Sequence, residues 1–200
     1  MKAAFLFTAA LSAAQIQHQH HPARSADEYA KILEDPSRDA WQKPHDVIQA
    51  LKLKPTEVIA DIGSGSGYFT RRFAMHAAKV YAVDIDAALL ARSKGDKIEA
   101  VLAIPDDPKL PASSVDTIFI CDVLHHIANR GAYYKKLTAS LKPGGRIVII
   151  DFYKRDLPVG PPVSMKLSED EVRAELAAAG FHQSAQHTIL PNQYFLEFQR

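Results

Sequence analysis

Residues 58–70 read VIADIGSGSGYFT and predict a buried strand, a glycine-rich turn and the start of a helix. Val58 to Ile62 is a short run of mainly apolar residues, which is typical of a parallel strand covered on both faces. Gly63, Gly65 and Gly67 allow the backbone to turn sharply and to approach a ligand closely. The predicted helix runs from about Gly65 to Ala78, with Phe69, Phe73 and Ala77 on one apolar face, and its first turn would present unpaired N–H groups to that ligand. The segment therefore predicts a ligand site at the end of a parallel strand.

The spacing of the glycines narrows the class of ligand. A dinucleotide site has the pattern G-x-G-x-x-G, whereas this turn reads G-x-G-x-G and follows an acid, Asp61. A carboxylate at that position would repel a pyrophosphate and would suit a ligand with a cationic amino group. A second acid, Asp84, ends the next apolar run at residues 80–83, where a ribose diol would be bound. An NAD(P)-binding oxidoreductase is the less favoured alternative.

Together the patterns D-x-G-x-G-x-G at residues 61–67 and V-x-A-V-D at residues 80–84 resemble the first two motifs of class I S-adenosylmethionine-dependent methyltransferases. V-L-H-H-I at residues 123–127 and L-K-P-G-G at residues 141–145 resemble later segments of the same family, in its small-molecule, quinone-biosynthesis-like "type 11" branch. The resemblance covers roughly residue 35 to the C-terminus. It implies a doubly wound, Rossmann-like α/β fold with a mainly parallel seven-stranded sheet and a C-terminal antiparallel hairpin.

The resemblance also implies S-adenosylmethionine as the cofactor. In this interpretation Asp61 orders the turn and the methionine amino group, Asp84 binds the ribose hydroxyls and Ile85 packs on the adenine. An acid in the proline-rich loop accepts from the adenine amine, and the carbonyl of Cys121 accepts from the methionyl amine. The expected cofactor residues are Asp61, Gly63, Ser64, Gly65, Gly67, Asp84, Ile85, Asp106, Asp107 and Cys121. The alternative for the turn and its acids is a purely structural role.

The expected reaction is the in-line displacement of a methyl group from a sulfonium. A general base is needed only if the acceptor must lose a proton, and the candidates are His126 and His125 because histidine titrates near neutrality. Either histidine could instead be packed or capped locally. Trp41 and Tyr153 are the candidate acceptor or lid residues, although Trp41 could equally anchor the N-terminal arm to the core. No metal site is expected.

A small-molecule acceptor is favoured by what the sequence lacks. No Pro-Pro-aromatic motif follows the fourth predicted strand, which argues against methylation of base amines, and a single cysteine argues against arsenic methylation. The net charge of +1, from 24 basic and 23 acidic residues, indicates no nucleic-acid partner. A non-catalytic module that binds S-adenosylmethionine or a nucleotide remains an alternative, and the sequence does not indicate an oligomeric state.

The 200 residues divide into three predicted parts. Residues 1–14 resemble a signal peptide, with one lysine, an apolar stretch too short to span a bilayer and small residues at its end. Residues 15–43 form an N-terminal arm or lid, and residues 44–200 form the methyltransferase domain. These features predict export to the periplasm or medium. A cytosolic location is the alternative, because S-adenosylmethionine is made in the cytosol.

Overall fold

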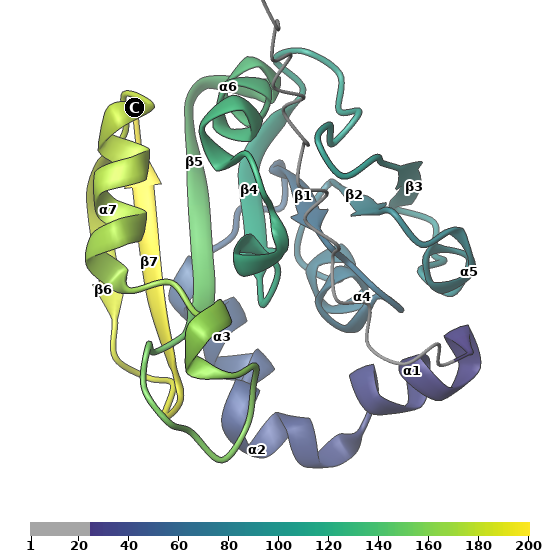
Figure 1. Ribbon diagram of the computed structural model, residues 1–200. Coiled ribbons are helices and arrows are strands. Elements are labelled where there is room, and N and C mark those ends of the chain that lie inside the picture. Colours follow the sequence, from purple (N-terminus) through teal and green to yellow (C-terminus); the bar gives the residue numbers. More distant parts are fainter. Residues whose placement is uncertain (1–24) are drawn as a thin grey trace, which may run out of the picture.

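The computed structural model describes residues 25–200, in which a seven-stranded sheet lies between two layers of helices (Figure 1). The strand order is β3-β2-β1-β4-β5-β7-β6. The first five strands in this order are parallel, β7 is antiparallel to β5, and β6 is antiparallel to β7. The strands are β1 Val58–Ile62, β2 Lys79–Asp84, β3 Ile98–Leu102, β4 Val115–Cys121, β5 Leu141–Phe152, β6 His182–His187 and β7 Gln193–Gln199. The predicted fold class is therefore confirmed, including the terminal antiparallel hairpin.

The helices fall into a short N-terminal series and those that cover the sheet. The N-terminal series comprises α1 Ala26–Leu33, the 3-10 turn η1 Pro36–Arg38, and α2 Asp39–Gln42. The others are α3 Pro44–Leu51, α4 Tyr68–Ala74, α5 Ala87–Leu90, η2 Leu124–His126, α6 Arg130–Ser140, η3 Val163–Met165 and α7 Glu169–Ala178. In residues 25–200 we find no helix with the length and apolar character that a membrane crossing requires. The predicted signal peptide lies outside the described residues.

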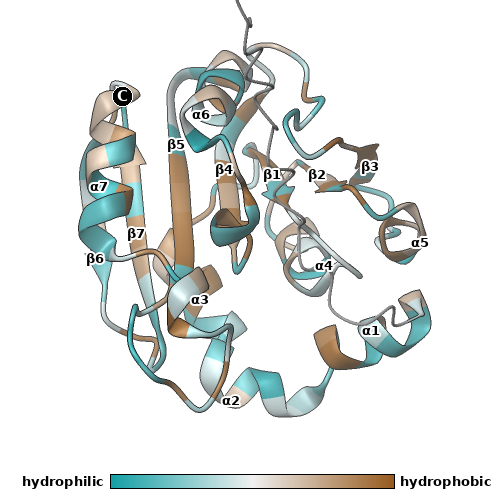
Figure 2. Cartoon of the chain, in the orientation of Figure 1, coloured by the Kyte–Doolittle hydropathy of each residue, from teal (hydrophilic) through white to brown (hydrophobic). Residues whose placement is uncertain are grey.

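Two hydrophobic cores stabilise the fold, one on each face of the sheet. On one face α6 and α7 bury Tyr134, Leu137 and Leu176 against the strands. On the other face α3 and α4 pack their apolar side chains against β1, β4 and β5. The apolar stretches of β4 and β5 stand out in the hydropathy colouring of Figure 2. Because both faces are covered, the central strands contain almost continuous apolar runs.

The helix after the glycine turn is shorter than predicted. The sequence suggested a helix from about Gly65 to Ala78, but α4 begins at Tyr68. Gly65 and Gly67 have φ values of 54° and 95°, which place them in the left-handed region that a right-handed helix excludes. The glycine loop therefore extends three residues further along the chain, to Gly67. The predicted apolar face of this helix is confirmed, since Phe73 packs edge-on against Phe119 of β4 with ring centroids 4.8 Å apart.

Candidate functional site

The glycine loop lies between β1 and α4, at the carboxyl ends of the parallel strands. The backbone N–H groups of Gly63 and Ser64 donate to the carbonyl of Val83 at 2.7 and 3.0 Å, which fastens the loop to β2. A Cβ atom on Gly63 would lie 2.2 Å from Cγ2 of Val123, and one on Gly67 would lie 2.6 Å from the Ser93 hydroxyl. Both positions therefore require glycine.

Asp84, at the end of β2, is bonded to this loop. Its Oδ2 accepts from the Gly65 N–H at 2.7 Å, and its Oδ1 accepts from the Asp86 N–H at 2.9 Å. Burial raises the pKa of the carboxyl group above its ordinary value. A carboxylate has about four lone-pair sites, so its backbone bonds do not saturate it and a ligand can also donate to it. The next residue, Ile85, is 60% exposed and presents an apolar side chain beside this acid.

Asp61 lies beneath the loop. Its side chain accepts a hydrogen bond from the Thr70 hydroxyl of α4 at 2.6 Å, and the residue is buried. Burial, with a smaller contribution from the Asp84 carboxylate, raises its pKa to about 7. Asp61 therefore ties β1 to α4, and the two roles expected from the sequence, toward the turn and toward the methionine amino group, stay predictions.

The Ser64 hydroxyl is buried and has no hydrogen-bond partner among the described residues. Burying an unpaired hydroxyl costs roughly 1–3 kcal/mol. A polar ligand in the glycine loop would satisfy this group, so the residues present fit a ligand with donors and acceptors.

The two acids of the proline-rich loop differ in their surroundings. Asp107 accepts from the Lys109 N–H at 2.8 Å, and the same amide is the main reason why its pKa is lowered. Its carboxylate also pairs with Lys136 at 3.2 Å. Asp106 makes no hydrogen bond or ion pair with residues 25–200 and lines a pocket of about 160 Å³ together with His126. Of the two, Asp106 is the acid free to bind a ligand.

The end of β4 combines buried polar groups from several elements. Cys121 is buried, and burial raises the pKa of its thiol well above the ordinary value. Asp122 has a left-handed backbone, with φ of 60°, and a pKa raised to about 7 by burial. Its carboxylate accepts from the Gln193 side chain of β7 and pairs with Arg38 at 3.4 Å. The contact with Gln193 could not be foreseen, because it joins residues 71 positions apart.

His125 and His126 occupy different surroundings, although their rings lie only 4.2 Å apart. His125 Nδ1 lies 2.9 and 3.0 Å from the two carboxylate oxygens of Asp151, on β5. Both side chains of this pair are buried. The sequence interpretation did not include Asp151. The available signal was an acid that interrupts the apolar end of β5, within the run IVIIDF at residues 147–152.

The N-terminal arm was predicted at residues 15–43, of which residues 15–24 lie outside the described residues; its helical part, residues 26–42, crosses the glycine loop. Figure 1 shows α1 and α2 passing along this end of the sheet. Glu34 accepts from the Ser66 hydroxyl at 2.6 Å, and a Cβ atom on Gly65 would lie 2.8 Å from Cδ1 of Leu33. The Arg38 guanidinium lies 4.1 Å from the centre of the Tyr68 ring. The arm therefore covers the loop and reaches β4 through Arg38.

Trp41 and Tyr153 do not pack together. The half-buried Trp41 ring contacts Phe152 at a centroid distance of 5.8 Å. Tyr153 contacts Tyr194 at 6.1 Å and belongs to the α6–α7 core. Only Trp41 lies on the arm that crosses the loop, and the acceptor role of either residue remains a prediction.

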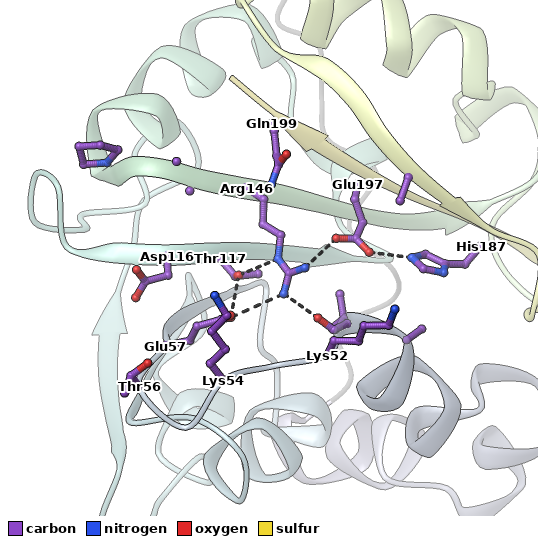
Figure 3. Close-up of a pocket in the computed structure, with 16 residues that line it drawn as sticks. Lys52, Lys54, Thr56, Glu57, Asp116, Thr117, Arg146, His187, Glu197 and Gln199 are labelled. Carbon is purple, nitrogen blue, oxygen red and sulfur yellow. Dashed lines mark hydrogen bonds and ion pairs between the residues drawn. The ribbon is translucent and has the colours of Figure 1, made fainter.

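A larger pocket of about 480 Å³ lies at the opposite end of the sheet (Figure 3). Its polar groups are bonded to one another. Arg146 donates to Glu197 at 2.9 Å, to Thr117 at 3.0 Å and to the Leu51 carbonyl at 2.8 Å. Because ligands of doubly wound sheets bind at the carboxyl ends of the strands, this internally bonded pocket is not the candidate site.

A parallel sheet with a glycine loop after β1 and an acid after β2 is the arrangement of class I methyltransferases, and comparisons with known proteins agree. The methyltransferase domain family matches residues 60–149. A crystal structure of a SAM-dependent methyltransferase from Aquifex aeolicus has a TM-score of 0.81 and 23% sequence identity, covering 88% of this chain and 99% of that one.

Three curated relatives are similar over part of their length. A probable S-adenosylmethionine-dependent methyltransferase of Mycobacterium tuberculosis is 29% identical over 152 residues, 70% of this chain and 55% of that protein. A ubiquinone/menaquinone biosynthesis C-methyltransferase of Hahella chejuensis is 29% identical over 117 residues, 53% of this chain and 46% of that one. A tRNA U34 carboxymethyltransferase of Ruthia magnifica is 30% identical over 141 residues, 62% of this chain and 43% of that one. The chain thus spans about half the length of the curated relatives it matches.

The chain therefore contains a methyltransferase domain at residues 60–149 and is similar to S-adenosylmethionine-dependent methyltransferases over most of its length.

Proposed function

We propose that the chain binds S-adenosylmethionine at the carboxyl ends of β1, β2 and β4 and transfers its methyl group to a small-molecule acceptor. The observation that carries this proposal is the glycine loop fastened to β2, with the Asp84 carboxylate at Gly65. In this arrangement the free lone pairs of Asp84 bind the ribose hydroxyls, and Ile85 packs against the adenine. The unpartnered Ser64 hydroxyl bonds the ligand in the loop.

The adenine amine and the methionine amino group of the cofactor each have candidate partners. Asp106, free of other bonds, accepts from the adenine amine. Asp61 and the carbonyl of Cys121 lie at the ends of β1 and β4, where the methionine amino group is expected. S-adenosylmethionine supplies an activated methyl group on a sulfonium. The protein chiefly orients the acceptor and excludes water, and the arm over the glycine loop suits the second task.

The small-molecule acceptor is supported by the near-neutral charge of the chain and by the relative named for quinone biosynthesis. The tRNA-modifying relative makes a nucleic acid the alternative acceptor. Tritium transfer from labelled S-adenosylmethionine into a cell extract, fractionated into small molecules, RNA and protein, separates these acceptors. We expect label in the small-molecule fraction. Label in RNA would contradict the acceptor class, and no label in any fraction would favour a binding module.

A thermal-shift screen tests the cofactor class. S-adenosylhomocysteine should raise the melting temperature, and NAD and NADP should not. An increase with NAD or NADP alone would identify a nucleotide-binding oxidoreductase instead.

A further inference from the structure

His125 is held by a buried acid on the neighbouring strand. Nδ1 of His125 lies 2.9 and 3.0 Å from the two oxygens of Asp151, and the two side chains are 3% and 0% exposed. An ionised carboxylate can only accept hydrogen bonds, so Nδ1 must carry the proton. The neutral ring therefore has its lone pair on Nε2.

Nε2 of His125 is free to act on another molecule. It makes no hydrogen bond with any of residues 25–200, since the bonds of this side chain use Nδ1 alone. His125 lies in η2, four residues after the end of β4, and Asp151 lies one residue before the end of β5. Both residues are therefore at the carboxyl ends of the strands, where the cofactor cleft is placed.

Burial of the Asp151 carboxylate is energetically unfavourable if the residue has only a structural role. It is fully buried in a strand whose neighbouring residues are apolar, and its Oδ1 accepts from the Phe152 N–H at 2.8 Å. An apolar side chain at such a position usually packs as well as a buried ionic group or better. The second bond also fixes the orientation of the carboxylate toward His125. These observations point to a positioning role for Asp151.

We propose that Asp151 holds His125 in the tautomer that makes Nε2 a general base, and that the acceptor is a molecule that loses a proton from oxygen or nitrogen as it is methylated. This inference rests on the proposed function. The acceptor atom forms a bond to the methyl carbon, and the carbon–sulfur bond of the sulfonium breaks with its electron pair staying on sulfur. The acceptor proton passes to Nε2, and the resulting imidazolium is stabilised by Asp151.

A second histidine–carboxylate pair provides a matched control. His187 Nε2 lies 2.6 Å from Glu197, in the pocket at the opposite end of the sheet (Figure 3). This pair also joins a histidine to a buried carboxylate, through Nε2 instead of Nδ1, but has no cofactor or acceptor beside it under the proposed function. His187→Gln should therefore leave methyl transfer unchanged.

The tautomer can be measured without any acceptor. Protein labelled with ¹⁵N-histidine should show His125 protonated on Nδ1 in a long-range ¹H–¹⁵N spectrum at pH 8. In Asp151→Asn the amide can present its NH₂ group to Nδ1, so the signal should move toward the Nε2–H tautomer. An Nε2–H tautomer in the wild-type protein would overturn the proposal.

The rate test uses tritium transfer from S-adenosylmethionine into the small-molecule fraction of a cell extract. His125→Gln and Asp151→Asn should each lower the initial rate by about 100-fold or more, the scale of general base catalysis. Their affinity for S-adenosylhomocysteine should stay within about threefold of wild type, about 0.7 kcal/mol or less. Added imidazole should restore activity to His125→Ala, which a purely structural histidine would not allow.

The outcomes separate this inference from the proposed function. Wild-type rates in His125→Gln and Asp151→Asn would overturn the inference and leave the proposed function standing. If the wild-type protein binds S-adenosylhomocysteine but transfers no tritium to any fraction of the extract, the inference is overturned and the non-catalytic binding module is favoured. A wild-type protein that does not bind S-adenosylhomocysteine would overturn both. If Asp151→Asn does not fold, the imidazole rescue of His125→Ala tests the general-base role instead, and absence of rescue would overturn it.

Discussion

The carboxylate of Asp84 accepts a hydrogen bond from the backbone N–H of Gly65 at 2.7 Å. This bond joins the end of β2 to the glycine loop that follows β1, although the two residues are 19 positions apart. It places an acid and a stretch of bare backbone side by side, which is what a ligand with hydroxyl and amino groups requires. The proposed cofactor site is built around this pair.

Gly65 should tolerate no side chain. Its φ of 54° is strained for other residues, and an added Cβ would meet Leu33 of the arm at 2.8 Å. Gly65→Val should abolish binding of S-adenosylhomocysteine and lower the free energy of unfolding by about 1–3 kcal/mol. Calorimetry and denaturant unfolding measure the two effects.

Gly131→Ala in α6 is the control for this variant, since a Cβ there would meet no atom within 4 Å. It should bind normally and be at least as stable as wild type. Normal binding by Gly65→Val would show that the glycine loop is structural only.

Asp61 should make stability depend on pH. Burial raises the pKa of Asp61 to about 7. Between about pH 4 and pH 7 the folded protein therefore keeps a proton on Asp61 that the unfolded chain, with a pKa of about 4, has lost. The contribution of Asp61 to the free energy of unfolding therefore decreases by at most roughly 4 kcal/mol as pH rises from about 4 to about 7. Above about pH 7 this contribution is constant.

Asp61→Asn keeps an oxygen for the Thr70 hydroxyl and removes the charge. Its stability relative to wild type should therefore increase between pH 5 and pH 8, as measured by urea unfolding at several pH values. Asp96→Asn, at an exposed position, should show no such trend. A parallel pH dependence of wild type and Asp61→Asn would contradict the burial argument.

The sequence was informative where a function depends on local spacing. The glycine turn and Asp84 could each be read from a short apolar run that ends in them, and the structure has a strand ending at each of the two points. The pairing of His125 with Asp151 and of Asp122 with Gln193 could not be predicted, because register and side-chain direction between distant strands decide them. The predicted start of α4 was wrong because the sequence alone does not show which glycines take a left-handed backbone.

Trp41 should be sensitive to ligand binding, both in its fluorescence and in the effect of its replacement on methyl transfer. Its ring contacts Phe152, and a Cβ atom on Gly160 would lie 2.6 Å from the Phe152 ring, so the arm meets the proline-containing segment at residues 158–162 there. If this contact closes the cleft, Trp41→Ala should lower methyl transfer more than it lowers the melting temperature. Trp41 is the only tryptophan, so its fluorescence should change when S-adenosylhomocysteine is added. Unchanged fluorescence, with a variant that is only less stable, would make Trp41 an anchor of the arm.

The N-terminus gives a separate prediction about location. We propose that residues 1–14 direct export, so the mature protein isolated from its own host should begin at Gln15 and lie outside the cytosol. N-terminal sequencing of the fractionated protein measures this. Cytosolic protein that retains Lys2 would contradict the proposal.

Titration of S-adenosylhomocysteine into wild type and Asp84→Ala, followed by calorimetry, tests the central claim most directly. The account predicts one binding site in the wild type. In the variant it predicts a loss of about 2–4 kcal/mol, roughly thirty- to a thousandfold in affinity, because charge-assisted bonds to two ribose hydroxyls are removed. Asp96→Ala should bind as the wild type does. Equal affinity in wild type and Asp84→Ala, or no binding by the wild type, would contradict the account.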